Sequence, residues 1–562
     1  MAMHMTPTYD VAVLGAGLAG SLIGALLARQ GVSVALIDPG THPRFAIGES
    51  TIPHTSLLLS LLALEYDVPE IDHLAYPDRI AAYVTSTCGI KRAFGFAYHT
   101  PGHPFEPAHG LQFGTSSKDE NHFFRQDIDA FVFYTAVRYG ADAYLSTRAR
   151  SVHIDRQGVR VDLEDGTPIR SRYVVDAGGY RSLLARQFDL RRDPPPLRHH
   201  ARTLFTHMIG VRPFTPPGHP FTLSWHENTL HHVFEGGWFW VIPFDNRPGS
   251  TNPLVSVGLT LDPRRYPPSD TPPEREFGAF LDLFPSIRRS FETARPVRPW
   301  TSTGRLQYDV HRVSGYRFCL TSHAAAFVDP LFSRGLINTV EMIRALLPPL
   351  LDALATDDFA PDAFAPMETL HRRVTDYNDR LVDGAYRSWI DFDLWNAWAR
   401  VWALGTILAE YRLMNALTDY TTSRDPHVLL GETPDPLFSP FEDPDYRTFF
   451  DRAEARLLAG LAAGHPPAAM ARDLFALTGA YAFPVPLRVD AMRRAGWLGP
   501  DETISPRNLH MAREGYRWAL THPDARDLFG HAETFFRWRA RHPDPHLGPS
   551  PQQPSQNFTG RR

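Results

Sequence analysis

The stretch that decides the fold is residues 9–20, YDVAVLGAGLAG, in which a β-branched apolar run meets Gly15, Gly17 and Gly20. The run predicts a buried strand, and the residues after it, up to the glycine at 31, repeat with helical periodicity. Glycine permits a tight turn, a close approach of a ligand to the backbone, and close packing of the helix on the strand. We therefore predict a strand, a turn and a helix whose amino terminus binds a phosphate.

A second strand follows and ends in an acidic residue. The segment VSVALID at 32–38 places Asp38 where a carboxylate can accept hydrogen bonds from ribose hydroxyls. Two strands, a helix and the acid supply the context that a GxGxxG motif requires, so a dinucleotide site is favoured over a structural turn. The motif alone does not distinguish FAD from NAD.

Four further segments select FAD. Each carries glycine or charged residues beside a predicted strand or helix: RFAIGES at 44–50, FFRQDIDAF at 123–131, YVVDAGGYRS at 173–182, and CLTSHAAAFVDPLFSRGLINTVEMIRAL at 319–346. Their order and spacing resemble the class A flavoprotein monooxygenase fold, in which two FAD stretches are separated by a substrate-binding sheet. The resemblance covers residues 8–350.

The resemblance implies an α/β fold of the GR2, p-hydroxybenzoate-hydroxylase-like type. It has a Rossmann-like FAD domain, an antiparallel substrate-binding sheet and a mainly helical C-terminal region. We expect a core at 1–352, a helical region covering the active site at 353–538, and a disordered tail at 539–562. Within the core we expect FAD parts at about 8–55, 120–185 and 300–352, and the sheet at about 75–118 and 195–299.

The family pattern implies FAD-binding roles for a set of glycines and polar residues. Arg44 is placed to meet an adenine or a phosphate, and Glu49 either orders the loop near the flavin ring or caps the following turn. The whole predicted set is Gly15, Gly17, Gly20, Asp38, Arg44, Gly48, Glu49, Ser50, Arg125, Asp176, Gly178 and Asp329.

The segment GGWFWVIPF at 236–244 places Trp238 and Trp240 on the same side of a strand. Taken alone, such a pair indicates core packing. However, WFWVIP matches the W-x-W-x-I-P signature of the flavin-dependent halogenases, and RFAIGEST at 44–51 and DPLFSRG at 329–335 match two further signatures. The chain therefore resembles this family, and within it the chlortetracycline-type actinobacterial halogenases.

This resemblance implies FADH2, oxygen and chloride as reactants. They yield hypochlorous acid at the flavin, and the acid travels to a lysine beside the substrate. A hydroxylase must bring its substrate up to the flavin, whereas a halogenase must keep the two apart. We therefore expect a wall between flavin and substrate that is formed by Trp238, Trp240, Ile242 and Pro243.

The lysine that the family pattern indicates is Lys91, in TCGIKRAFGFAYH at 87–99. Its glycine and aromatic neighbours suggest a partly buried strand, where burial lowers the pKa of an amine. A neutral lysine can attack hypochlorous acid to form a chloramine, whereas a charged one can polarise it by hydrogen bonding. The sequence leaves both roles open, beside the alternative of a surface lysine next to Arg92.

Chloride needs backbone N–H donors, and the resemblance places them at Ser333, Arg334 and Gly335, at a predicted helix start. The alternative, compatible with the first, is that Ser333 caps the helix. Two departures from the family stand out. Phe332 replaces the glutamate of the tryptophan-specific members, which favours a phenolic substrate over an indole, and Ser322-His323 replaces a Gly-Asp pair that contacts the ribityl chain.

Composition excludes several other classes of protein. The 562 residues carry a net charge of −5 without a basic stripe, so we expect no nucleic-acid partner. No run of about 18 uninterrupted apolar residues indicates a membrane span. The two cysteines fit a reducing cytoplasm. HENTLHH at 226–232 lacks the HExxH spacing, so we assign no metal.

The C-terminal third is predicted to be helical. An aromatic-rich pattern at 394–417 carries Trp395, Trp398 and Trp402 and favours burial against the core, and further helices are expected at 443–464 and 510–520.

The sequence thus predicts an FADH2-dependent chlorinating enzyme that acts in natural-product biosynthesis on an electron-rich aromatic, free or carrier-tethered. Because it holds one dinucleotide motif, it needs a separate NAD(P)H-dependent flavin reductase. The alternatives are an FAD-dependent aromatic hydroxylase on the same fold and a flavin-binding protein without turnover.

Overall fold

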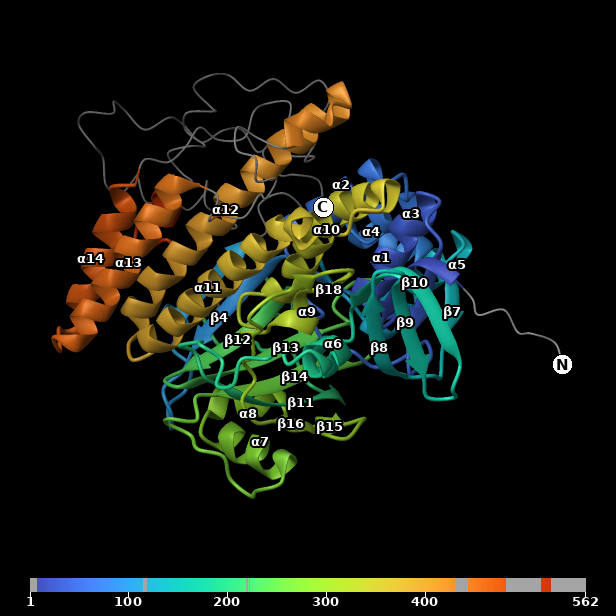
Figure 1. The fold of residues 1–562 in the computed structure, drawn as a ribbon. Coiled ribbons are helices and arrows are strands. Elements are labelled where there is room, and N and C mark those ends of the chain that lie inside the picture. The colour runs from blue at the N-terminus through green and yellow to red at the C-terminus, as the bar shows by residue number, and fades with distance from the viewer. Residues whose placement is uncertain are drawn as a thin grey trace.

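The computed structural model describes residues 8–114, 119–218, 221, 223–429, 440, 443–481 and 517–526. Figure 1 shows two β-rich parts side by side, with the C-terminal helices along one side of the second. The predicted tail at 539–562, and residues 510–516 of the predicted helix at 510–520, lie outside the described residues.

The strand, turn and helix predicted from the opening motif are present, and the strand lies inside the first sheet. The strand order is β17-β18-β10-β1-β2-β7, and β8 and β9 extend the sheet from β10. Strand β1 pairs in parallel with both β10 and β2. Its residues are almost all buried, because helices cover both faces of a parallel sheet. The strands are β1 (Thr8–Leu14), β2 (Val34–Ile37), β7 (Asp142–Tyr144), β8 (Ala149–Asp155), β9 (Gly158–Leu163), β10 (Pro168–Asp176), β17 (Ser314–Gly315) and β18 (Phe318–Leu320).

The second sheet has the order β15-β11-β14-β13-β12-β4-β5, with β16 paired to β11. It is antiparallel as predicted, except that β4 and β12 pair in parallel. A parallel pair needs a long crossover, and the chain between these two strands supplies one. The strands are β4 (Ala93–Tyr98), β5 (Gly110–Gly114), β11 (Arg202–Ile209), β12 (Asn228–Phe234), β13 (Gly237–Pro243), β14 (Val255–Leu261), β15 (Arg295–Pro296) and β16 (Thr301–Thr303).

A separate two-stranded ladder joins the two parts. Strands β3 (Gly89–Lys91) and β6 (Glu120–His122) pair antiparallel, with Lys91 opposite Glu120.

The helices of the core surround the first sheet or cover one side of the second. The first group is α1 (Leu18–Arg29), α2 (Pro53–Glu65), α3 (Pro69–His73), α4 (Pro77–Tyr83), α5 (Arg125–Arg138), α6 (Leu183–Gln187), α9 (Ser322–Ala325) and α10 (Arg334–Thr356). The second group is α7 (Pro273–Asp282) and α8 (Pro285–Ser290), which lie on the side of the sheet away from the C-terminal helices (Figure 1).

The described part of the C-terminal third is mainly helical, as predicted, in α11 (Ala365–Ser388), α12 (Phe392–Ser423), α13 (Pro444–Ala462) and α14 (Pro467–Gly479). Trp395, Trp398 and Trp402 are buried, as predicted, but they contact different parts of the molecule. Trp395 and Trp402 contact the aromatic rings of β4, whereas Trp398 donates to the carbonyl of Leu381 on α11. None of the helices in the described part of the chain has the length and apolarity that a membrane crossing needs.

Candidate active site

The glycine turn after β1 is built as the sequence predicts. Gly15 has φ +102°, and a Cβ there would lie 2.7 Å from the carbonyl oxygen of Ala177. A Cβ on Gly20 would lie 1.9 Å from the carbonyl oxygen of Gly15, so the helix packs on the turn only with glycine at this position. Gly17 precedes α1, whose first turn has neither a side-chain cap nor an acidic residue. Its amides are therefore oriented to bind an anion.

Charged side chains gather around this turn. The Arg44 guanidinium lies 3.6 Å from the position that a Cβ on Gly17 would take, and its Nη2 donates to Asp38 at 2.6 Å. Asp38 also accepts from the Ala16 amide at 2.7 Å. Burial opposes ionisation of Asp38, but the bonds from Arg44 and Ala16 outweigh it and lower the pKa of the carboxyl. An arginine, an ionised carboxylate and uncapped helix amides fit the pyrophosphate and ribose of a dinucleotide.

Arg125 binds protein groups. Its guanidinium forms an ion pair with Asp129 and donates to the carbonyls of Ile47 and Gly48, at 2.6 and 3.0 Å. It thereby fixes the 44–50 loop to the start of α5, next to the glycine turn.

Asp176 caps the turn after β10. It is fully buried and accepts from the Gly178 amide, the Ser182 hydroxyl and the Leu184 amide, at 2.8, 2.7 and 2.9 Å. Burial raises its pKa despite these bonds. Asp176 and Gly178 therefore stabilise the turn after β10, within a segment that is predicted to bind FAD.

Three predicted residues from distant segments meet at one point. Lys91 Nζ donates to Ser50 Oγ at 2.8 Å, and Ser333 Oγ donates to the same oxygen at 3.1 Å. Thr229 on β12 completes the contact with its hydroxyl 2.7 Å from Ser50 Oγ. The predicted lysine, flavin loop and chloride loop are therefore joined through a single serine hydroxyl.

The sequence suggests that Lys91 is partly buried, whereas the structure shows that it is fully buried. Its side chain is 0% exposed, so the surface alternative is wrong. Nζ also donates to the carbonyl of Thr51 at 2.9 Å and lies 3.4 Å from the centre of the Phe94 ring. Burial lowers the pKa of the amine well below its ordinary value, although the charge of Glu120 acts in the opposite direction. The Phe94 ring also favours the cation, but by only about 2 kcal/mol.

The surroundings of Lys91 contain residues that sequence reasoning missed. Glu120, opposite Lys91 in the ladder, accepts hydroxyl hydrogen bonds from Thr51 and Ser56, each at 2.6 Å. The pairing of β3 with β6 decides this contact, and no local pattern indicates it.

Glu49 does not cap the helix that follows it, whose N-cap has no side-chain hydrogen bond. Its carboxylate accepts from His207 Nε2 at 2.7 Å, so it joins the flavin loop to β11 of the second sheet. His207 carries no motif, and only the placement of the two sheets reveals the pair.

The tryptophans of β13 share one face, as predicted. Their ring centres lie 5.8 Å apart, and each indole is fixed by a hydrogen bond, from Trp238 to Tyr386 at 3.0 Å and from Trp240 to Ser256 at 3.3 Å. Trp240 presses on Gly258, where a Cβ would lie 2.1 Å from its ring. Because both rings are held on two sides, they form a rigid surface.

Of the other two predicted wall residues, Ile242 shares the face of the tryptophans, whereas the Pro243 side chain lies on the opposite face of β13, where it lines a small cavity, and is not part of the tryptophan surface. Ile242 is buried in the same core cluster as the two tryptophans, and the Pro243 carbonyl accepts from His122 Nδ1 at 2.8 Å. A row of rings, Trp238, His231 and Phe94, leads from the wall to Lys91, with neighbouring centres 5.3 and 5.8 Å apart. The lysine and the wall therefore belong to one continuous surface.

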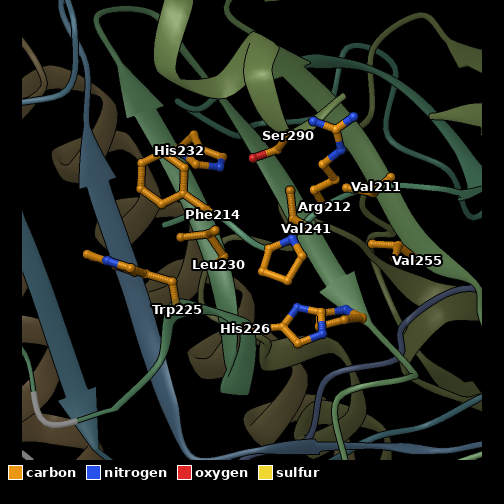
Figure 2. A pocket seen from close by; sticks show the side chains of 12 residues that line it. Val211, Arg212, Phe214, Trp225, His226, Leu230, His232, Val241, Val255 and Ser290 are labelled. Carbon is orange, nitrogen blue, oxygen red and sulfur yellow. The ribbon is translucent and has the colours of Figure 1, made fainter. Parts of the chain in front are cut away.

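The other face of the second sheet carries a separate small cavity, shown in Figure 2. Its volume is about 10 Å³, and Phe214, Trp225, His232 and Ser290 are among the residues that line it. This is room for about one water molecule. A cavity of this size does not accommodate an aromatic substrate.

The predicted chloride loop begins α10. Ser333 lies at the N-cap position with φ 53° and makes no side-chain cap, so the capping alternative is wrong. Its hydroxyl instead donates to Ser50, as described above. Arg334 is buried and donates to Asn378 at 3.2 Å. Gly335 and His323 both line a cavity of about 40 Å³, and a Cβ on Gly335 would lie 3.1 Å from the imidazole Nε2.

Asp329 also lines this cavity, and one of its carboxylate oxygens binds groups outside the loop. Its Oδ2 accepts from His199 Nε2 at 3.0 Å and from the Tyr386 hydroxyl at 3.4 Å. Phe332, three residues later, stacks on Trp402 with ring centres 4.8 Å apart. The loop at 329–335 is therefore held between the second sheet and the C-terminal helices.

A Rossmann-like dinucleotide turn and a buried lysine behind an aromatic wall define a class of FAD-dependent oxidoreductase. The family model described as tryptophan halogenase matches residues 10–71. The chain is 45% identical over 476 residues to tetracycline 7-halogenase of Kitasatospora aureofaciens, covering 83% of this chain and 85% of that one. It is 43% identical to monodechloroaminopyrrolnitrin halogenase PrnC of Pseudomonas fluorescens, covering 83% of each.

A solved structure gives the same result. The crystal structure of halogenase PltM in complex with phloroglucinol and FAD is similar with a TM-score of 0.82 and 35% identity, over 87% of this chain and 99% of that one. The chain belongs to the flavin-dependent halogenase family. It is an oxidoreductase that uses FAD and chloride, and the hydroxylase alternative is not favoured.

Proposed function

We propose that this halogenase chlorinates a phenolic or polyketide aromatic, with Lys91 as the residue that carries chlorine to the substrate. The observation that supports it most is the meeting of Lys91, Ser50 and Ser333 within hydrogen-bond distance. When bound, reduced flavin supplies the two electrons with which oxygen and chloride give hypochlorous acid. The residues that would hold the flavin cofactor are the α1 amides, Arg44 and the 44–50 loop. The amides at 333–335 would hold chloride.

The geometry of Lys91 favours the neutral amine. A neutral amine has two N–H groups and one lone pair, and both N–H groups have acceptors in Ser50 Oγ and the Thr51 carbonyl. The lone pair is then left to attack the chlorine of hypochlorous acid. The N–Cl bond forms as the Cl–O bond breaks, and the hydroxide leaves with one amine proton as water. Attack by the aromatic carbon then transfers chlorine, and the ring proton returns to the amine nitrogen.

Separation of the flavin from the substrate by the two tryptophans makes a relay through Lys91 necessary. Trp238 and Trp240 are held rigidly, so they can keep the aromatic substrate away from the flavin while hypochlorous acid passes. We assign the substrate to the tryptophan side of the second sheet, which the C-terminal helices cover: Trp402 and Trp395 of α12 pack on Phe94 and Phe96 of β4. This division, with a core at 1–352 and a covering region at 353–538, is part of the proposal.

The substrate class rests on Phe332. A buried phenylalanine at this position offers no carboxylate to the positively charged ring intermediate, which favours a substrate that its own hydroxyl group activates. Two of the three reported relatives support a phenolic ring, because one is named for tetracycline and another is a complex with phloroglucinol, whereas PrnC is named for an aminopyrrolnitrin. A separate flavin reductase supplies the reduced cofactor, and the buried, unbridged Cys88 and Cys319 are compatible with a cytoplasmic setting.

Mass spectrometry of a turnover mixture tests the proposal. The mixture contains the protein, FAD, a flavin reductase, NADH, chloride and a panel of phenols and tetracyclic polyketides. We expect a product with the chlorine isotope doublet, and Lys91→Ala should reduce it at least about 100-fold while FAD affinity is unchanged. A product carrying only an added oxygen contradicts chlorination, and full activity of Lys91→Ala contradicts the relay.

A further inference from the structure

A chain of buried hydrogen bonds connects the tryptophan wall to the loop that begins α10, and it passes through α11. Trp238 Nε1 donates to the Tyr386 hydroxyl at 3.0 Å, and that hydroxyl donates to Asp329 Oδ2 at 3.4 Å. Three residues from three distant parts of the chain therefore meet at one phenol oxygen.

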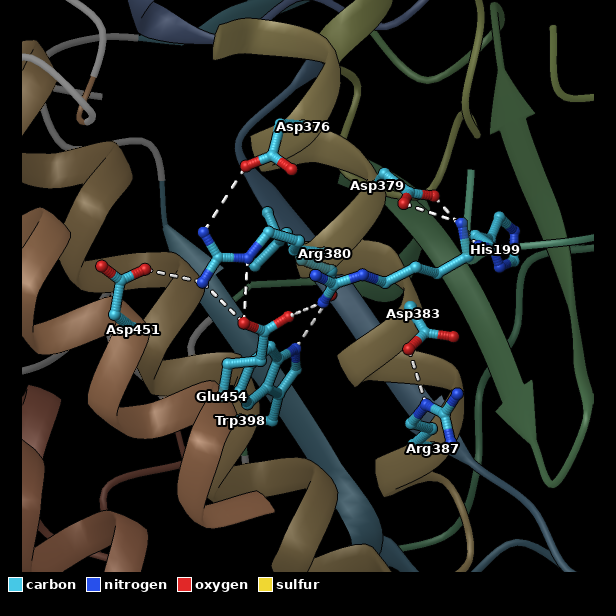
Figure 3. Close-up of polar contacts among 11 residues, drawn as sticks. His199, Asp376, Asp379, Arg380, Asp383, Arg387, Trp398, Asp451 and Glu454 are labelled. Carbon is cyan, nitrogen blue, oxygen red and sulfur yellow. Dashed lines mark hydrogen bonds and ion pairs between the residues drawn. The ribbon is translucent and has the colours of Figure 1, made fainter. Parts of the chain in front are cut away.

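The far end of the chain is fixed as well. His199 Nε2 donates to the same Asp329 oxygen at 3.0 Å, and the His199 ring lies 4.4 Å from the Tyr386 ring. The backbone amides of Arg198 and His199 donate to Asp379, at 2.8 and 3.0 Å, as Figure 3 shows. Because Asp379 and Tyr386 both lie on α11, this helix holds the chain at two points.

The members of the chain are shielded from water. Trp238, Tyr386, Asp329 and His199 are 1%, 5%, 6% and 0% exposed. A buried polar group that loses its partner costs about 1–3 kcal/mol, so these bonds persist in the folded protein. The Tyr386 hydroxyl is the acceptor that the structure gives the Trp238 N–H, and the Asp329 loop carries Ser333, which contacts Ser50 beside Lys91.

We propose that Tyr386 is a positioning residue of the halogenase, which fixes the Trp238 indole to the loop at 329–335. The wall and the loop then keep one relative position, and hypochlorous acid is confined to the route that ends at Lys91. Tyr386 touches neither reacting group and acts through Trp238 and Asp329. The inference rests on the proposed function, because it assigns a structural cause to the separation of flavin and substrate.

The experiment compares Tyr386→Phe with the wild type in the complete turnover mixture. The quantity measured is chlorinated product formed per NADH consumed, with FAD affinity measured separately. We expect the product ratio to fall about five- to tenfold, the change that the loss of one buried hydrogen bond gives, while FAD affinity stays within about twofold.

The matched control is Tyr446→Phe. The Tyr446 hydroxyl donates to the Val401 carbonyl at 2.9 Å within the same helical region, away from the wall. This variant also loses one buried hydroxyl, so it measures the effect of that loss in general. An equal fall of the product ratio in both variants overturns the proposal, and so does an unchanged ratio in Tyr386→Phe.

A double-mutant cycle tests whether Tyr386 acts through Trp238. Trp238→Phe keeps an aromatic ring but removes the N–H, and its combination with Tyr386→Phe should lower the product ratio no further than one change alone. Additive effects overturn the proposal. Chemical unfolding of the same four proteins gives an independent reading: we expect non-additive stability changes, and additive ones also overturn it. If the wild type makes no chlorinated product, the proposed function fails, while the unfolding cycle still decides the link between the two residues.

Discussion

The two faces of strand β13 belong to one short segment of the chain, but the side chains that surround them differ. The face with Trp238 and Trp240 contacts hydroxyls, imidazoles and a glycine, and both indoles are hydrogen-bonded. The face with Phe239 packs in a cluster of aliphatic and phenyl side chains under α7 and α8. Both faces are buried, so burial alone does not distinguish the wall from the core.

The neighbouring strand β14 repeats the contrast. Ser256, Gly258 and Thr260 lie towards the tryptophans, whereas Val257 and Leu259 lie in the Phe239 cluster. Successive side chains alternate across a sheet, so a single strand can serve two environments. The difference shows that one face is arranged for fixed positions and the other for packing. Three predictions test this difference, and a fourth tests the state of Lys91.

The largest expected effect on stability belongs to the packing face. Phe239→Ala should lower the free energy of unfolding by about 3–5 kcal/mol, because it removes a phenyl ring from a closed cluster. The product ratio per folded molecule should stay near the wild-type value. Denaturant unfolding measures the first quantity and turnover of the folded fraction the second. A large fall in product ratio with little loss of stability would remove the distinction between the faces.

A substitution on the tryptophan face should instead lower the amount of chlorinated product formed per NADH. Gly258→Ala places a methyl group 2.1 Å from the present position of the Trp240 ring, so the indole must move. We expect a loss of about 1–3 kcal/mol in stability and a clear fall in chlorinated product per NADH. Gly278→Ala is the control, since a Cβ at that position meets nothing within 4 Å. An unchanged product ratio in Gly258→Ala would show that the position of Trp240 does not matter.

The pH dependence of stability tests the state of Lys91. Its pKa is lowered in the folded protein, so between the folded and unfolded pKa values the unfolded chain binds one more proton. Wild-type stability should therefore rise as the pH increases towards about 10.4. The variant Lys91→Met has no amine to protonate at this position. It should therefore be more stable than the wild type at neutral pH, by about 1 kcal/mol. The difference in stability should shrink at high pH. A constant difference from pH 7 to pH 10 would indicate an unshifted lysine.

The smallest expected effect is that of Ser256→Ala. It removes the acceptor of the Trp240 N–H, whose 3.3 Å bond is long. We expect a loss of about 1 kcal/mol in the free energy of unfolding and a change in product ratio under about threefold. Comparison with Gly258→Ala in the same assays separates the hydrogen bond from the packing contact. A larger effect than that of Gly258→Ala would make the hydrogen bond the main support of the indole.

Much of the nucleotide end follows from local sequence. Gly15 and Gly20 fix the turn because a Cβ at either position would overlap the backbone, and Gly15 also has a positive φ. The strands and α1 follow from apolar periodicity, which is a property of neighbours in the chain. Lys91 and the two tryptophans were found through a family pattern, and the alternation along β13 placed both indoles on one face.

The tertiary structure alone decided the partners of these residues. Glu49 binds His207, Lys91 faces Glu120 across a ladder, and Tyr386 joins Trp238 to Asp329. Each pair is far apart in the chain, and a hydrogen bond between distant segments leaves no periodic signal in either one. The sequence determined which groups are candidates for the chemistry, through the family pattern, and which elements hold them, since elements depend on local periods and backbone angles. Their contacts were decided by how the two sheets and α11 pack together, because packing is a property of the whole chain.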